Sequence, residues 1–150
     1  MMTQTEIRAR YGLGIWGLAT AAFSLVFFLR GGAATYADDS IRMFVAAMIL
    51  GVGFIAQIIM IYQTREKSNG KALIRDERDL EISLQANEIA LVAVLVFVFV
   101  VSISLFLGYE NAGSLPIGWM WFLAYITACF GLLAQSIATL IVHGKMSGNG

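Results

Sequence analysis

This 150-residue chain has little of three things: it contains one proline, one cysteine, and charged side chains at only 13% of its positions. A lone cysteine excludes an internal disulfide, and Cys129 lacks the neighbouring cysteines and histidines of a zinc site. We expect it to act as a small apolar residue within a helix. With little charge and a formal net charge of zero, the chain offers no electrostatic case for binding nucleic acid.

Patterns that carry chemistry are also missing. The sequence holds no Ser/His/Asp set, HExxH motif or Walker loop, and its one GxGxxG, at Gly12, Gly14 and Gly17, lies in an apolar stretch where small residues more simply pack helices. No ionisable residue lies deep within an apolar window, whereas the small multidrug transporters depend on a glutamate inside their first span. We therefore expect no enzymatic activity, no cofactor and no metal.

Apolar residues dominate the chain. They make up 59% of it, against about 45–50% in soluble domains. A helix needs about 20 mainly apolar residues to cross the roughly 30 Å of hydrocarbon in a bilayer. The windows that meet this length are 11–29, 41–62, 89–107 and 117–142. The sequence thus predicts an all-α membrane protein, a single domain of four transmembrane helices in two hairpins, in contact with the lipid bilayer.

The first window has a competing interpretation. Arg8 and Arg10 precede it and the small residues 31–34 follow it, as in a cleaved signal peptide. Its length is greater than that of a typical signal-peptide apolar region, which favours a retained span.

Basic residues indicate the orientation, because Lys and Arg near span ends stay in the cytoplasm. Eight of the ten basic residues flank one side of the predicted spans: Arg8, Arg10, Arg65, Lys67, Lys71, Arg75, Arg78 and Lys145. The remaining two, Arg30 and Arg42, bracket a short loop on the other side. We expect both termini to be cytoplasmic, loop 108–116 to lie outside, and Trp119 and Trp121 to lie at the outer interface of the membrane.

Small residues at helical spacing predict the faces through which the spans pack. These faces are Gly14, Gly17, Ala21 and Ser24 in the first span, Ala46, Gly53 and Gln57 in the second, and Ala124, Ala128, Gly131, Gln135 and Ala138 in the fourth. Gln57 and Gln135 are the intramembrane polar residues. An amide in hydrocarbon needs a partner, so we expect both to face the bundle interior.

The third span has few small residues, so we expect much of its surface to face lipid. Its packing stripe of Ile82, Ala86, Ile89 and Ala93 begins before the membrane, and nothing between Lys71 and Leu107 resembles a helix breaker. We therefore predict that the cytoplasmic segment 63–88 contains a helix that starts near Lys71 and enters the membrane unbroken.

The stretch RDERDLE, residues 75–81, places six charges in seven residues. On a helix Glu77, Glu81 and Glu88 fall on one side and Lys71, Arg75 and Arg78 fall nearly opposite, and leucines lie close to the acidic side. This arrangement has three interpretations: a solvated juxtamembrane helix, a surface that docks a partner, or a cation site, although no EF-hand spacing is present. The candidate partner-contact residues are Leu73, Asp76, Glu77, Arg78, Asp79, Leu80, Glu81 and Leu84.

The run Asp76-Glu77-Arg78-Asp79, followed by Ile82, Ala86 and an apolar span, resembles the signature of a family of small prokaryotic membrane proteins of unknown function. That family has two hairpins of spans, with the Asp-Glu-Arg motif opening the second. The resemblance implies a prokaryotic plasma membrane and supplies no reaction. The chain departs from the family at residues 83–85, where a basic residue usually precedes the alanine.

Two functional hypotheses follow. The first is a non-enzymatic scaffold, accessory subunit or membrane regulator that acts through the charged cytoplasmic helix, as a homo-oligomer or with a membrane or cytosolic protein partner. The second is a small channel or carrier with a polar route. The candidate residues for that route are Gln57, Ser102, Ser104, Thr127 and Gln135. A bond between the two glutamines, or one cavity shared by them, would distinguish the hypotheses.

Overall fold

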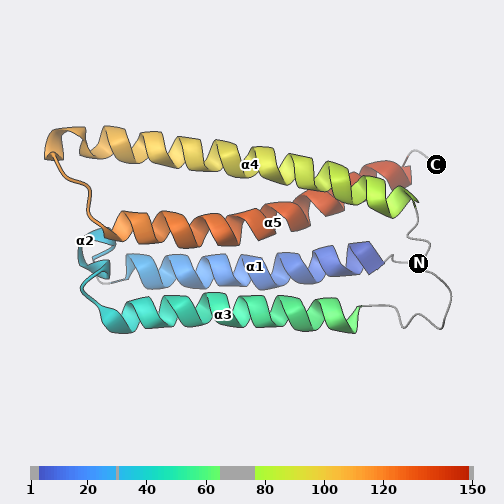
Figure 1. The fold of residues 1–150 in the computed structure, drawn as a ribbon, viewed down its shortest axis with the longest axis horizontal. Helices are drawn as coiled ribbons and strands as arrows, with labels where there is room; N and C mark the ends of the chain where they lie inside the picture. The colour runs from blue at the N-terminus through green and yellow to red at the C-terminus, as the bar shows by residue number, and fades with distance from the viewer. Residues whose placement is uncertain (1–3, 30, 65–76, 149–150) are drawn as a thin grey trace.

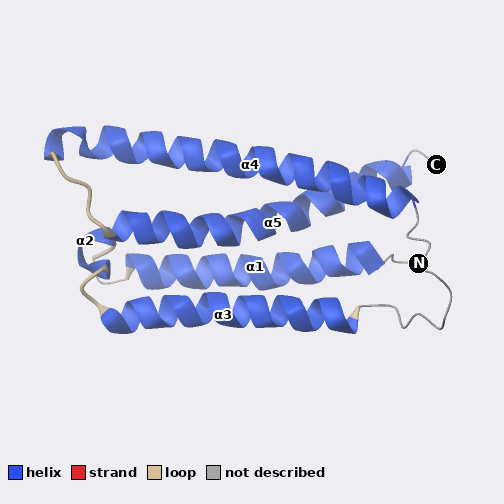
Figure 2. Ribbon diagram, viewed as in Figure 1, coloured by secondary structure: helices blue, strands red, loops and turns tan. Residues whose placement is uncertain are grey.

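The computed structural model describes residues 4–29, 31–64 and 77–148. Its long helices are α1 (Gln4–Phe28), α3 (Ser40–Gln63), α4 (Glu77–Tyr109) and α5 (Gly118–Gly148), with the short α2 (Ala33–Tyr36) and the 3-10 turn η1 (Glu110–Ala112) between them. The described residues form no strands, as Figure 2 shows. Four of these helices are long and apolar enough to cross a membrane, which confirms the predicted all-α membrane fold.

Helix α4 continues well beyond the predicted third span. It is a single helix of 33 residues with no break at Ala86, which confirms the continuous helix from Glu77 onward; residues 71–76 lie outside the described part. At about 1.5 Å per residue it is about 50 Å long, against about 30 Å of hydrocarbon. Helix α4 is therefore longer than one crossing needs, and we expect its charged first turns, with Glu77, Arg78, Asp79 and Glu81, to project from the membrane.

The helices form an open row rather than a closed bundle (Figure 1). α1 packs antiparallel to α3, α4 packs antiparallel to α5, and contact between α1 and α5 joins the two hairpins. The order across the molecule is thus α3, α1, α5, α4, and the outer helices α3 and α4 make at most marginal contact with each other. Large apolar side chains remain exposed along both outer helices, as lipid requires.

The packing face of α1 differs from the predicted one. Gly14 and Ala21 are exposed, so the prediction that they lie on the packing face is wrong. The buried face is Ala9, Gly12, Trp16, Ala19, Phe23 and Phe27. Large aromatic rings of α1 fill the space between its two neighbours, and small residues receive them: a Cβ on Gly53 of α3 would lie 3.3 Å from the Trp16 ring. The small residues at this interface therefore lie on α3, where they leave space for the aromatic rings of α1.

The other predicted faces are correct in part. In α3, Ala46 and Gly53 are buried and Gln57 is partly buried, as predicted. In α4, Ile82 and Ala86 are buried, but the next buried residue is Ala90, and Ile89 is 47% exposed. In α5, Ala138 is buried and Ala124 is exposed. Because the row is open, each outer helix needs only one narrow packing face.

An aromatic cluster packs between the ends of the helices that lie nearest α2. Phe23 and Phe27 of α1 and Tyr36 of α2 are fully buried, and rings from α5 pack on them; the Phe27 and Phe122 centroids are 4.5 Å apart. Gly118 begins α5 directly against the backbone of Ala33, where any side chain would overlap. This contact fixes the α2 turn to the start of α5.

Candidate functional site

The projecting end of α4 has two different faces. Ile82 and Ala86 are each 1% exposed, and the contacts of this helix are mainly with α5. Leu80 and Leu84, by contrast, are 44% and 61% exposed. Both leucines precede the predicted span 89–107, whereas the apolar part of α4 extends from Leu80. They form an exposed apolar pair that no element of the described chain covers.

Glu81 lies beside these leucines. Its carboxylate accepts a hydrogen bond from Gln85 Nε2 at 3.2 Å, one turn further along the same exposed face. Leu73 and Asp76, predicted as contact residues, lie outside the described residues, and Glu77, Arg78 and Asp79 form the first turn of α4. The structure thus brings Leu80, Glu81 and Leu84 together on one surface, named here the α4 end face.

Gln57 has the polar partner that its position requires. Its Oε1 accepts a hydrogen bond from Trp16 Nε1 at 3.3 Å, between α3 and α1. The same oxygen lies 3.9 Å from the position a Cβ would take on Gly12. That separation is an ordinary van der Waals contact, and the tight neighbour of Gly12 is Ser136 Oγ, 2.6 Å from the same position. The polar partner predicted for Gln57 is confirmed.

Gln135 also has a polar partner, but it does not face the interior. Its Nε2 donates to Asn87 Oδ1 at 2.9 Å, and both side chains are exposed. They line a groove of about 520 Å³ between α4 and α5. The predicted interior position is wrong because α5 lies between two neighbours: Ala134 and Ala138 are buried, while Gln135 turns toward the α4 side.

The residues of the predicted polar route lie on separate surfaces. Ser102 and Ser104 are exposed on α4, and the Ser104 hydroxyl donates to Val100 O within its own helix. Thr127 lines the α4–α5 groove with Gln135, while Gln57 lies between α1 and α3. The groove that Gln135 lines does not include Gln57.

Sequence reasoning missed a buried arginine. Arg42, in the first turn of α3, is 7% exposed, and its guanidinium donates to Phe27 O at 2.5 Å and to Val26 O at 3.3 Å. These carbonyls belong to the last turn of α1, which has no basic residue of its own. The last carbonyls of a helix lack partners within the helix and carry partial negative charge. Arg42 therefore caps the C-terminus of α1.

Arg8 makes the matching contact at the other end of the same hairpin. Its Nη2 donates to Thr64 O at 2.8 Å and its Nε donates to Thr64 Oγ1 at 2.7 Å, and Thr64 is the C-terminal cap of α3. α3 also lacks a basic residue in its last turn. We name Arg8 and Arg42 the arginine caps. An arginine near the start of each of two antiparallel apolar helices is the sequence signal that could have predicted them.

The surroundings of Arg42 contain an unsatisfied hydroxyl. Tyr36 is fully buried, the Arg42 guanidinium lies 5.4 Å from its ring centre, and its hydroxyl has no hydrogen-bond partner among the described residues. Burial raises the pKa of Tyr36 above 10.0, nearby Tyr125 raises it further, and the positive charge of Arg42 opposes both. The arginine thus meets an aromatic face on one side and the carbonyls of α1 on the other.

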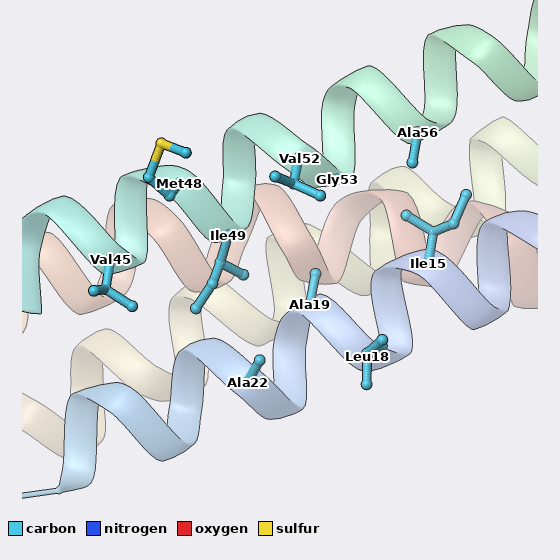
Figure 3. Close-up of a pocket in the computed structure, with 10 residues that line it drawn as sticks. All are labelled: Ile15, Leu18, Ala19, Ala22, Val45, Met48, Ile49, Val52, Gly53 and Ala56. Atoms are coloured by element: carbon cyan, nitrogen blue, oxygen red, sulfur yellow. The ribbon is translucent and has the colours of Figure 1, made fainter.

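A groove of about 450 Å³ follows the α1–α3 interface (Figure 3). Ile15, Leu18 and Ala22 of α1 and Met48 and Val52 of α3 lie along it, and none of its lining residues is charged. In a membrane such a surface is in contact with lipid chains.

The described residues hold no group of three or more His, Cys, Asp or Glu side chains placed to bind a metal ion. Comparisons of the chain with family models, with curated proteins and with solved structures find no match.

Proposed function

We propose that this protein is a non-enzymatic integral membrane protein that acts as a scaffold, accessory subunit or membrane regulator, with the projecting end of α4 as its contact surface. The observation that carries this proposal is the exposure of Leu80 and Leu84, at 44% and 61%, on a helix that is too long for the bilayer. Exposed leucines beyond the membrane lose contact with water when a partner covers them.

The charges at this end select the partner rather than supply the affinity. Exposed ion pairs contribute only about 0–1 kcal/mol each, whereas burial of a leucine contributes about 1.5–3 kcal/mol. Complementary charge instead accelerates association and fixes the register of the complex. With Glu77, Asp79 and Glu81 in the first turns of α4, the favoured partner is a second copy or another protein that offers a basic surface.

The distribution of polar side chains favours this proposal over a channel. A polar route needs side chains that line one continuous path, and in the described chain Gln57 and Gln135 contact different partners in different interfaces.

We further propose that both termini lie in the cytoplasm, on the basis of the asymmetric distribution of Lys and Arg. The plasma (inner) membrane location is proposed on the resemblance to the family of small prokaryotic membrane proteins. Single cysteines introduced at Ser114 and Lys145, both exposed, test the orientation with a membrane-impermeant thiol reagent. Labelling of Ser114→Cys from outside and protection of Lys145→Cys are expected. The reverse pattern contradicts the orientation.

The contact surface is tested by reversing its charge in native membranes. The variant Glu77→Lys with Glu81→Lys should lose the partner or the oligomer, measured as the mass of the particle extracted with its surrounding lipid. Glu110→Lys is the matched control, because it reverses an exposed carboxylate just beyond the opposite end of α4. An unchanged particle mass in the double variant, at low and at high salt, contradicts the proposal.

A further inference from the structure

Another groove, distinct from the α4–α5 and α1–α3 grooves, lies where the N-terminal end of α1 meets the C-terminal end of α5. It has a volume of about 480 Å³. Its lining residues are Glu6, Arg10, Leu13, Leu140, His143 and Gly144. This groove is separate from the α4 end face, and neither functional hypothesis makes use of it.

The lining changes from charged to apolar along the helix axes. Glu6 and Arg10 lie in the first turns of α1 and His143 in the last turns of α5, while Leu13 and Leu140 lie deeper along the same helices. Glu6 and Leu13 are separated by about 10 Å at 1.5 Å per residue. A charged end at the membrane surface and an apolar end within the hydrocarbon match the polarity of a phospholipid.

Opposite charges are held close together in the charged part. Arg10 Nη2 lies 2.7 Å from Glu6 Oε1, and the Glu6 side chain is 16% exposed while that of Arg10 is 58% exposed. The Glu6 carboxylate is therefore the more buried of the two groups, and the Arg10 guanidinium is the more exposed. A guanidinium has five N–H donors and binds phosphate with two of them in parallel, and an imidazole N–H from His143 adds another donor.

We propose that this groove binds the phosphoethanolamine headgroup of a membrane phospholipid. The phosphate contacts Arg10 and His143, the primary ammonium contacts the Glu6 carboxylate, and an acyl chain lies on Leu13 and Leu140. An anionic headgroup without an ammonium would leave Glu6 facing added negative charge. A choline headgroup carries a positive charge but has no N–H to donate to Glu6, so the groove distinguishes the two zwitterionic classes.

The proposal is tested on the full-length chain after delipidation, by native mass spectrometry with equimolar phosphatidylethanolamine, phosphatidylcholine and phosphatidylglycerol. The expected preference for phosphatidylethanolamine over phosphatidylcholine is about tenfold, the effect of one charge-assisted hydrogen bond. Equal retention of the lipids, or a preference for phosphatidylglycerol, overturns the proposal. Displacement of the bound lipid by excess inorganic phosphate alone would show a free-anion site instead.

Variants assign the preference to this groove. Glu6→Gln should abolish the preference for ethanolamine over choline and leave total lipid retention nearly unchanged, whereas Arg10→Gln should reduce retention of both. Lys145→Gln is the matched control, because Lys145 is an exposed cation on the same end of α5 and does not line the groove. An ethanolamine preference that persists in Glu6→Gln overturns the proposal. The lipid competition on the unmodified chain remains decisive if a variant does not fold.

Discussion

The two hairpins of this protein use polar side chains differently. In the α1–α3 hairpin the arginine caps lie across helix ends, and each donates to the terminal carbonyl region of the neighbouring helix. In the α4–α5 hairpin the polar links are uncharged: the exposed amides of Asn87 and Gln135 pair, and Trp119 Nε1 donates to the Tyr109 hydroxyl at 2.8 Å where the two helices join. A stacked pair of rings, Phe97 and Phe130, 4.4 Å apart, adds an apolar contact. Among the described residues the first hairpin is thus joined by an arginine at each end and by the Trp16–Gln57 bond between them, whereas the second is joined by neutral side chains.

Charged side chains also differ in burial between the two hairpins. In the first hairpin, Arg42 is buried and serves the fold. In the second, Glu81 and Glu88 are exposed on α4, and Glu81 contacts only a neighbouring side chain of its own helix among the described residues. The exposed charge near the start of α4 belongs to the surface through which we propose that the protein meets a partner.

The largest expected effect breaks the first hairpin at Arg42. Arg42→Gln leaves carbonyls of Val26 and Phe27 buried without their donor, and we expect a loss of about 2–3 kcal/mol in the free energy of unfolding. Titration with SDS in mixed micelles measures this loss.

The second arginine cap provides the comparison. Arg8 is less buried, so Arg8→Gln should lose only about 1 kcal/mol. Equal and small losses in the two variants would show that the caps do not hold the hairpin.

An effect comparable to that of Arg42→Gln is expected where the two hairpins meet. Gly118→Ala places a methyl group against the backbone of Ala33, and we expect a loss of about 1–3 kcal/mol as the α2 turn shifts. Gly14→Ala is the control, because a Cβ there has nothing within 4 Å, and its unfolding free energy should not fall. Loss in Gly14→Ala alone would restore the small-residue face first predicted for α1.

The amide pair of the second hairpin should contribute less again. A double-mutant cycle with Asn87→Leu and Gln135→Leu should give a coupling of about 0.6 kcal/mol, the average for interhelical hydrogen bonds in membranes. The same SDS titration measures it. A coupling of zero would mean that the described hydrogen bond does not form in the bilayer.

The smallest effect at neutral pH is expected at Tyr36. Its hydroxyl has no partner among the described residues, so Tyr36→Phe should change stability little. Burial raises the pKa of the folded state above 10.0, so the unfolded chain releases this proton first as pH rises. Stability is therefore full below the ordinary pKa and falls as pH rises through the folded pKa.

Measurement of unfolding temperature against pH checks this sign. The unmodified protein should lose stability above the ordinary tyrosine pKa of 10.0, and Tyr36→Phe should lose less. If the unmodified protein and Tyr36→Phe lose the same stability at alkaline pH, a group other than Tyr36 causes the loss.

The sequence by itself determined the fold class, the four spans and the unbroken start of α4 from Glu77. The physical reason is that a helix needs a minimum number of consecutive apolar residues to cross the hydrocarbon, and such a run is visible in the sequence itself. The need of Gln57 for a polar partner followed from the same cost of burying an unpaired amide.

Only the tertiary structure decided which helix faces meet. Gly14 and Gly12 are equally small, yet Gly12 is buried and Gly14 is exposed, because the neighbouring helices rather than local composition select the face. The same holds for Arg42, which borders a short loop in the sequence and caps α1 only because α1 ends beside it. Most residues of a span are apolar because lipid surrounds the helix, so the hydropathy pattern identifies the spans but not the faces through which they pack.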